Sequence, residues 1–503
     1  MFVRQKKNKS GVVSIQVIDK SSGRYRMLKT IGSSADKKEI ERLVEEGKQW
    51  IKNFTGMQEF DFTDYRRHTQ LVLEGLEEIS VHGPELLLGK LFDQIGFDQI
   101  KEYLFRKLVL TRLCYPASKL KTTDYLSKYQ YLNVDVQVIY RYLDRLYNHQ
   151  KALVQHISFT HTLKILGNKV SIVFYDVTTI YFEAESEDDL RKTGFSKEGK
   201  HQHPQIVLGL LVSKGGYPLA YDIFEGNQFE GHTMLPIISA FKEQYQLDNL
   251  IVVADAGLLS GNNIALLEQD GIEYILGARI KAEGRALKQK VLALGLKNGQ
   301  SALIKKDDKT NLVVSYSETR AKKDAHNRDR GLARLEKQIR SGRLTKENIN
   351  NRGYNKFLQL ENQVKISIDK TKIADDQKWD GLKGYITNTH LSKEEVIEHY
   401  KDLWQIEKAF RVAKTDLEIR PIYHRVQRRI EAHISIAFAA YKVYKELERQ
   451  LKEKRSSLSP EKAIDIAKTI YAIKVVHPVT NEVIYTTHIK TEEQKYLAKL
   501  FGF

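Results

Sequence analysis

Two aspartates occupy positions at which a sequence can build a metal site. Asp176 follows the apolar run 172–175, and Asp255 follows the apolar run 251–254. Ligands of α/β proteins bind at the sheet edge where strands end, so we expect both carboxylates there. Like charges held close together repel, and divalent cations allow both groups to remain ionised. The two strand ends therefore predict a candidate metal site.

A third candidate carboxylate lies in the predicted helix 400–414. Tyr400, Glu407 and Lys414 are spaced seven residues apart, which places them on one face of a helix. This face offers one carboxylate flanked by a hydroxyl and an ammonium group. Arg411 follows Glu407 by four residues, so an ordinary ion pair on the helix surface is the alternative interpretation.

Two other residues are weaker candidates. Glu431 is the rival third carboxylate, but neither a tyrosine nor a lysine lies seven residues from it. The single cysteine, Cys114, excludes an intramolecular disulfide and a cysteine-rich zinc site. We expect Cys114 to be a small buried hydrophobic residue.

The elements from residue 171 onward predict the sheet that positions these groups. Apolar runs bounded by turn residues predict strands at 171–175, 206–212, 219–224, 250–254 and 274–276. Helical patterns predict helices at 233–245, 262–268, 392–415 and 425–453. Strands that are joined by tight turns and then alternate with helices are typical of a mixed α/β sheet.

The rest of the chain has a different character. Residues 11–31 predict two short strands, 34–51 a helix, and 70–165 a mostly helical region. The polar, basic segment 281–382 contains short β-like pieces. Because a structureless loop of that length is implausible inside a domain, we expect an inserted subdomain there. For the last fifty residues the sequence predicts no particular structure.

The charge is concentrated in three windows of the 503-residue chain, whose formal net charge is +17. Residues 1–53 hold 13 basic and 6 acidic side chains, residues 319–346 hold 10 and 3, and residues 400–430 hold 8 and 4. The remainder is close to neutral. Local basic patches on a near-neutral body indicate a polyanionic partner.

Length and hydropathy exclude several classes of protein. A chain of 503 residues is expected to form two to four domains. The N-terminus lacks the apolar core of a secretory signal, and the apolar stretch 206–212 is too short to span a bilayer. We expect a cytoplasmic protein without a membrane partner, and collagen-like or disordered classes are excluded.

Together these residues resemble the DDE transposases of bacterial insertion sequences. Asp176, Asp255 and Glu407 are 79 and 152 residues apart, and the second interval has room for an insertion. The helix 400–414 is similar to the Tyr-x2-Arg-x3-Glu-x6-Lys signature of the branch with a β-rich insertion before the glutamate. Further similar segments are Glu225-Gly226-Asn227, Trp404-Gln405-Ile406-Glu407 and Arg420-Pro421-Ile422-Tyr423-His424.

One position departs from that signature. Its arginine falls on Leu403, so a neighbour such as Lys401, Lys408 or Arg411 would have to replace the guanidinium.

The resemblance implies an α/β fold with an RNase H-like mixed-sheet catalytic domain interrupted by a β-rich insertion. A small N-terminal α+β module and a helical N-terminal region would precede it. The expected parts are a basic DNA-binding module at 1–56, a helical DNA-binding or linker region at 57–165, the catalytic domain at 166–280 and 383–453, the insertion subdomain at 281–382, and a C-terminal tail at 454–503.

The resemblance also implies the chemistry. Two Mg2+ ions, with Mn2+ as the expected substitute, would be held by Asp176, Asp255 and Glu407. One ion would activate water or a 3′-hydroxyl for attack, and the other would stabilise the leaving oxygen. Tyr400 and Lys414 would hold the terminal phosphate.

Further contacts with DNA are expected on both sides of the catalytic carboxylates. Trp379 would stack on a flipped base, with a packing role as the alternative. The other expected contacts with DNA are Arg411, Lys408, Arg420, Arg4, Lys6, Lys7, Arg24 and Arg26.

The expected function is therefore a transposase that binds terminal inverted repeats, cleaves the DNA ends and joins them to target DNA. It would act as a homodimer in a synaptic complex at the bacterial nucleoid. The alternatives are a catalytically silent DNA-binding protein derived from a transposase, and an RNase H-like nuclease.

Overall fold

The computed structural model describes most of the chain as two units. The described residues are 1–55, 65–183, 186–196, 199, 202–258, 261–350, 352–361, 365–478 and 480–503. The first unit contains Met1–Glu77 and Val475–Ile484, and the second contains Glu78–Lys474 and Tyr485–Phe503. The predicted boundary at 56 and 57 lies outside the described residues.

The first unit contains a three-stranded antiparallel sheet with one long helix. Its elements are β1 (Phe2–Lys7), β2 (Val13–Asp19), β3 (Arg26–Ser34), α1 (Lys37–Thr55) and α2 (Tyr65–Glu74). β2 is the central strand, and alternate positions such as Ile15 and Val17 are fully buried with Leu43 of α1. The sequence predicts only two strands, because β1 is largely exposed and basic and has no apolar alternation.

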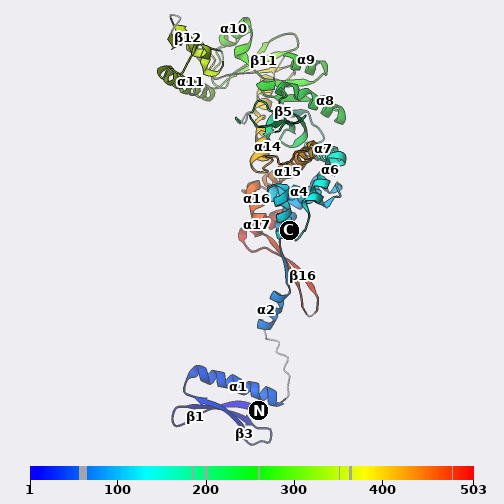
Figure 1. Cartoon of the computed structure of the whole chain (residues 1–503), viewed down its shortest axis with the longest axis vertical. Helices are drawn as coiled ribbons and strands as arrows, with labels where there is room; N and C mark the ends of the chain where they lie inside the picture. The colour runs from blue at the N-terminus through cyan, green and yellow to red at the C-terminus, as the bar shows by residue number, and fades with distance from the viewer. Residues whose placement is uncertain are drawn as a thin grey trace. The chain divides into compact units, whose positions relative to one another are not determined.

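The second unit contains an eight-stranded mixed sheet (Figure 1). Its strands are β5 (Ile172–Tyr181), β6 (Gln205–Ser213), β7 (Pro218–Glu225), β8 (Ile251–Ala254), β9 (Glu273–Ala278), β10 (Ser301–Lys305), β11 (Asn311–Tyr316) and β14 (Leu382–Thr387). They lie in the order β10-β11-β14-β9-β8-β5-β6-β7. β8 pairs in parallel with β5 and β9, and the other pairs described are antiparallel. The predicted mixed α/β sheet is confirmed.

Helices cover both faces of this sheet. On one face, Phe174 and Val253 belong to a core shared with α13 (Lys393–Lys401), α14 (Trp404–Thr415) and α15 (Gln427–Glu453). On the other face, their neighbours Val173 and Val252 pack in a core with α8 (Met234–Tyr245), α9 (Gly261–Gln269) and α10 (Arg285–Ala293). Successive side chains of a strand point to opposite faces, which explains the division.

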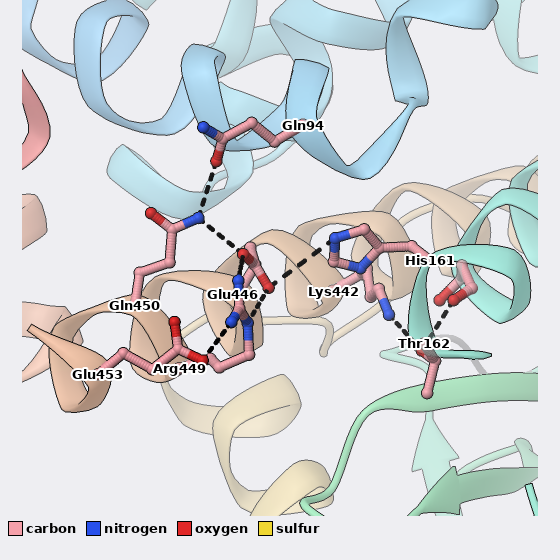
Figure 2. A network of polar contacts seen from close by, with 9 residues as sticks. Gln94, His161, Thr162, Lys442, Glu446, Arg449, Gln450 and Glu453 are labelled. Atoms are coloured by element: carbon pink, nitrogen blue, oxygen red, sulfur yellow. Dashed lines mark hydrogen bonds and ion pairs between the residues drawn. The ribbon is translucent and has the colours of Figure 1, made fainter. Parts of the chain in front are cut away.

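The helical region packs around α15 within the same unit. Its helices are α3 (Lys90–Ile95), α4 (Tyr103–Cys114), α5 (Lys119–Gln130), α6 (Val136–Arg145) and α7 (Lys151–Ile165). Figure 2 shows polar contacts that join α15 to two of them: Gln450 donates to Gln94 of α3, and Lys442 donates to Thr162 of α7. Residues 78–165 therefore share a core with the sheet, unlike the separate region predicted at 57–165.

The predicted insertion at 281–382 differs from the structure in extent and in content. β10 and β11 extend the main sheet, because β11 pairs with β14 in register. The segment between β11 and β14 contains α11 (Glu318–Arg340), β12 (Leu358–Glu361), β13 (Lys365–Ile368) and α12 (Lys370–Gln377). It has a small core of its own around Leu335 and Phe357. It is more helical than β-rich, and it begins after β11 rather than at residue 281, because β10 and β11 belong to the main sheet.

The last fifty residues contain regular structure that the sequence patterns do not predict. The elements are α16 (Pro460–Ala467), β15 (Tyr471–Val476), β16 (Val483–His488) and α17 (Glu492–Phe501), and β15 lies between β16 and β4 (Leu76–Val81). Within the described part of the chain, no helix is long and apolar enough to cross a membrane.

Candidate active site

Strand register brings the two predicted aspartates to adjacent positions. The parallel pairing of β5 with β8 ends at Tyr175 opposite Ala254, so Asp176 and Asp255 are the next residues on neighbouring strands. Neighbouring strands lie about 4.8 Å apart. Phe174 and Val253 face the α13–α14 side, and alternation directs residues two positions later to that side too. Both carboxylates therefore belong to the face covered by those helices.

Asp176 differs from the prediction in one respect. It lies inside β5 rather than at its end, because β5 continues to Tyr181 paired with β6. The Asp176 carboxylate accepts a hydrogen bond from the Val177 amide at 2.8 Å. The parallel half of the pairing, and not the whole strand, ends at this aspartate.

Tyr400 holds the second aspartate. Its hydroxyl donates to Oδ1 of Asp255 at 2.9 Å, and the tyrosine is only 5% exposed. Burial, and then the charge of Asp255, raise the pKa of Tyr400, so the hydroxyl remains a proton donor. Gly277 of β9 makes the space, since a Cβ there would lie 2.5 Å from the tyrosine oxygen. In this structure the Tyr400 hydroxyl contacts Asp255, and its contact with the terminal phosphate stays a prediction.

The predicted single helix 392–415 is two helices. α13 begins with a capping box, in which Ser392 and Glu395 bond each other's backbone amides, and it ends at Lys401. α14 begins at Trp404, and the two linking residues keep right-handed conformations. Leu403, at the position of the missing signature arginine, is 7% exposed and packs in the core. A tight turn thus separates Tyr400 from Glu407, so the heptad argument from one straight helix does not apply.

Two basic residues that the sequence reasoning missed complete this site. Lys383 of β14 lies with its ammonium 4.3 Å from the centroid of the Tyr400 ring. Burial and the charge of Arg320 lower the pKa of Lys383, while the charges of Asp255 and Glu407 act in the opposite direction. Asp255, Lys383, Tyr400 and Arg320 line one cavity of about 380 Å³. The third carboxylate therefore acts electrostatically on the same few side chains as Asp255.

A sequence signal for these basic residues is faint. Lys383 is the one charged residue of a six-residue strand, and Arg320 is one of ten basic residues in a polar window. Nothing local connects either residue with Asp255. Strand pairing between β9 and β14 brings Lys383 to the site.

The donor set suits a divalent cation in type and position. Carboxylate oxygens are the ligands that Mg2+ prefers, and Asp176 and Asp255 are adjacent in register. Across the described residues, no three acidic, histidine or cysteine side chains are close enough together to hold a metal ion. To complete a metal site, Glu407 would have to approach the two aspartates. The positive charge of Lys383 acts on Asp255 and Glu407 in the present arrangement.

The rival glutamate has a structural role. Glu431 is 7% exposed on α15, and it pairs with the Lys151 ammonium at 2.6 Å. This pair joins α15 to α7. Glu407, whose charge acts on Tyr400 and Lys383, remains the candidate third carboxylate.

The predicted DNA contacts around Glu407 fall into two groups. Arg411 is exposed and Lys414 is half-buried on α14. Lys408 forms an ion pair with Glu448 of α15, and Trp379 is half-buried against the core of the sheet. The structure thus favours the packing alternative for Trp379 and gives Lys408 a partner within the chain.

The predicted contacts of the first unit lie on its surface. Lys6, Lys7, Arg24 and Arg26 are exposed on β1, β3 and the turn before β3. Arg4 is half-buried and donates to the Gln16 side chain at 2.8 Å.

Comparisons with known proteins identify a family over the part of the chain that contains these residues. The family described as Transposase DDE domain matches residues 168–442, which include Asp176, Asp255 and Glu407. A search of curated proteins finds no match. Two solved structures are similar at low identity. One is a piggyBac transposase synaptic complex with hairpin DNA, with 10% identity, a TM-score of 0.40, and coverage of 73% of this chain and 69% of that chain.

The other is a Mos1 transposase paired-end complex with left transposon end, with 12% identity, a TM-score of 0.16, and coverage of 46% and 66%. The family match spans more than half of the 503 residues and contains the whole carboxylate site. The chain belongs to the DDE transposase family.

Proposed function

We propose that this protein is a DNA transposase whose active site contains Asp176, Asp255 and Glu407. The observation that carries the proposal is the register of β5 and β8, which makes the two aspartates neighbours on the face of α13 and α14. The charge of Glu407 acts on Tyr400 and Lys383, and both of these residues line the cavity beside Asp255.

The three carboxylates would hold two Mg2+ ions, or Mn2+ in their place. Bound there, the ions supply an activated oxygen nucleophile and stabilise the leaving oxygen of an in-line phosphoryl transfer. Tyr400 fixes the orientation of Asp255 through its hydrogen bond. Lys383 places a positive charge beside Asp255 and Glu407, where it can contact a phosphate of the scissile strand.

The basic surfaces would bind the DNA. The exposed lysines and arginines of the first unit suit recognition of terminal inverted repeats, and α11 carries a second basic surface. A homodimer holding two ends in a synaptic complex would then cleave both and join them to target DNA. We assign the protein to a bacterial insertion sequence and to the tyrosine–arginine–glutamate–lysine branch, with Leu403 in place of the arginine.

The test is cleavage of a labelled duplex carrying the inverted repeat, with and without Mg2+. Asp176→Asn, Asp255→Asn and Glu407→Gln are each expected to lower the cleavage rate by at least about 10³-fold while end binding is retained. Glu273→Gln is the matched control. Glu273 is the first residue of β9, so it lies at the opposite end of the strands from Asp255.

Each other result has a defined meaning. Near wild-type cleavage by any triad variant would overturn the site assignment. End binding without cleavage in any divalent ion would identify a silent DNA-binding protein. Cleavage of unrelated duplexes without strand transfer would identify a nuclease.

A further inference from the structure

A second charged cavity lies away from the three carboxylates, in the second unit. It has a volume of about 600 Å³ and is lined by the start of α5, the end of α4, the segment 418–424 and α15. Its charged lining residues include Arg112, Lys119, Lys121 and Arg420, against the single carboxylate of Glu418. Glu418 is exposed, so the interior of this pocket is cationic.

Two of these cations are buried and form no ion pair with a carboxylate among the described residues, although the charge of the exposed Glu418 acts on Arg112. Arg112 and Lys119 are each 5% exposed. Arg112 donates to the Leu417 carbonyl at 3.4 Å, and Lys119 lies 3.5 Å from Nδ1 of His433. Buried charges are normally paired, because removing an unpaired one from water is costly.

The neighbouring histidines cannot supply the missing negative charge, and they are poorly suited to a metal. Burial, followed by the charges of Lys119 and Arg112, lowers the pKa of His424 to about 3 and lowers the pKa of His433 well below its usual range. Both rings are therefore neutral near pH 7. His433 contacts the Ile419 carbonyl through Nε2 at 3.1 Å, which leaves Nδ1 to accept from Lys119. Two adjacent cations would repel a metal ion.

Helix geometry adds donors of the same kind. α5 begins at Lys119 after the N-cap Ser118, and residues 116–121 line the pocket. The first amide groups of a twelve-residue helix point out of its N-terminus and favour an anion. The buried guanidinium, the buried ammonium and the helix start thus converge on one pocket.

We propose that this pocket binds a phosphate group of the DNA backbone, with Arg112 and Lys119 as its buried ligands. The choice of DNA as the source rests on the proposed function and on the rim. Tyr423 is 66% exposed and Tyr115 is 43% exposed at the mouth of the pocket, where aromatic rings can contact a sugar or base.

The position of the pocket fits a phosphate a short distance from the cut. The Arg420 guanidinium lies 5.9 Å from the centroid of the Tyr181 ring, and Tyr181 is five residues beyond Asp176 on β5. At about 3.4 Å per residue, Asp176 and Tyr181 lie roughly 17 Å apart along β5, which is the length of about five base pairs of a duplex. One strand thus connects the cationic pocket to the carboxylate site.

The first experiment measures thermal unfolding of the full chain in sodium phosphate and in sodium chloride of equal ionic strength. We expect phosphate to raise the Tm of the wild type more than chloride does. Burial and the charge of Arg112 lower the pKa of Lys119 well below its usual value, so the free pocket disfavours the ammonium form. Lys119→Met should therefore fold with a Tm in chloride at least as high as that of the wild type, and should lose the extra rise in phosphate. Lys442→Met removes a fully buried lysine of α15 elsewhere and is the matched control that keeps the rise.

The second experiment titrates a labelled end-bearing duplex at several salt concentrations. Lys119→Met should weaken binding about tenfold and reduce the slope of log K against log salt by about 0.9, as expected for one lost phosphate contact. Tyr423→Ala, at an exposed position, should weaken DNA binding and leave the phosphate response of Tm unchanged. When single backbone linkages near the cut are replaced by uncharged ones, one replacement should weaken binding by the wild type but not by Lys119→Met.

Several outcomes would overturn the proposal. A wild type with no phosphate-specific rise in Tm, or a Lys119→Met variant with the same rise, would show that the pocket does not hold phosphate. Loss of the rise with unchanged DNA affinity and salt slope would assign the pocket to free phosphate instead of DNA. Cleavage by the wild type separates the two proposals: a protein that binds DNA through Lys119 and never cleaves retains the pocket and loses the transposase function.

Discussion

The carboxylate site around Asp255 and the cationic pocket around Arg112 differ in both exposure and charge: Asp255 and Glu407 are exposed, whereas Arg112 and Lys119 are buried. At the first, Asp255 accepts a hydrogen bond from the Tyr400 hydroxyl and has the positive charge of Lys383 nearby. At the second, a guanidinium and an ammonium lack an acidic partner among the described residues. Carboxylate oxygens suit a divalent cation at the first site, and the cost of unpaired buried charge suits the second to an anion. DNA with its divalent ions can supply both.

A third region shows a buried charge that is paired with a carboxylate. Arg328 of α11 is 5% exposed, and its two terminal nitrogens donate to the two oxygens of Asp380 at 2.6 and 2.7 Å. The pair closes the small core of the segment between β11 and β14. The Arg328–Asp380 pair is therefore the reference for the cations of the pocket that form no ion pair.

The largest expected effect comes from comparing the two buried arginines. Arg328→Met should lower the free energy of unfolding by about 3–5 kcal/mol, because Asp380 would lose its partner. Arg112→Met should be neutral or stabilising, because its charge has no acidic partner. Urea unfolding of both variants measures the difference, and equal destabilisation would contradict the distinction between a paired and an unpaired buried arginine.

Lys442 is another buried cation, and its contribution to stability is expected to depend on pH. Burial lowers the pKa of Lys442 from 10.5 to about 7, with Glu446 opposing and Arg449 reinforcing the shift. Between these two values the unfolded chain binds a proton that the folded chain does not, so stability rises with pH across the window. The free energy of unfolding should gain up to about 1.4 kcal/mol per pH unit from this group.

Lys442→Met should remove that gain and stabilise the protein near pH 7. Urea midpoints of wild type and variant between pH 7 and pH 9 give the contribution as a difference, so that other titrating groups cancel. A constant difference across this range would show that the lysine is not held neutral.

The positioning of Asp255 is the next test. Tyr400→Phe should lower the cleavage rate about 10–100-fold and leave end binding unchanged, since the hydroxyl orients a metal-binding carboxylate. Gly277→Ala should act in the same direction, because its Cβ would displace the tyrosine oxygen. Tyr385→Phe is the control, as its hydroxyl lies 3.5 Å from Ser315 and contacts no carboxylate that the structure describes.

The smallest effect is expected at Lys383. Lys383→Met removes the cation beside Asp255 and Glu407, so Mg2+ should bind more tightly and raise the Tm by a few degrees more than in the wild type. Lys383→Arg keeps the charge and should resemble the wild type. A smaller Mg2+ response in Lys383→Met would mean that the lysine does not compensate these carboxylates.

The sequence predicted the strands that carry the aspartates, because fully buried strands appear as continuous apolar runs. The mixed sheet and the transposase family are confirmed. Several parts were wrong because pairing partners are distant in sequence. β10 and β11 look like pieces of a polar insertion, yet they join the sheet through β14, more than sixty residues later.

Two features show how local pattern fails at the site itself. The heptad spacing of Tyr400 and Glu407 is real, but a turn at Asp402 and Leu403 divides the helix while Leu403 is buried in the core. Leu403 stands at the position of the signature arginine, and it packs in a hydrophobic core.

By itself, the sequence determined which residues are candidates for the chemistry: three carboxylates, two of them placed by apolar strands, and three basic windows. Only the tertiary structure decided which charges meet. Register placed Asp176 beside Asp255, β14 brought Lys383 to them, and packing of α5 and α15 buried Lys119 beside His433. Strand and helix periodicity are local properties of the chain. The net charge of a site, and the groups that balance it, depend on segments that are far apart in the sequence.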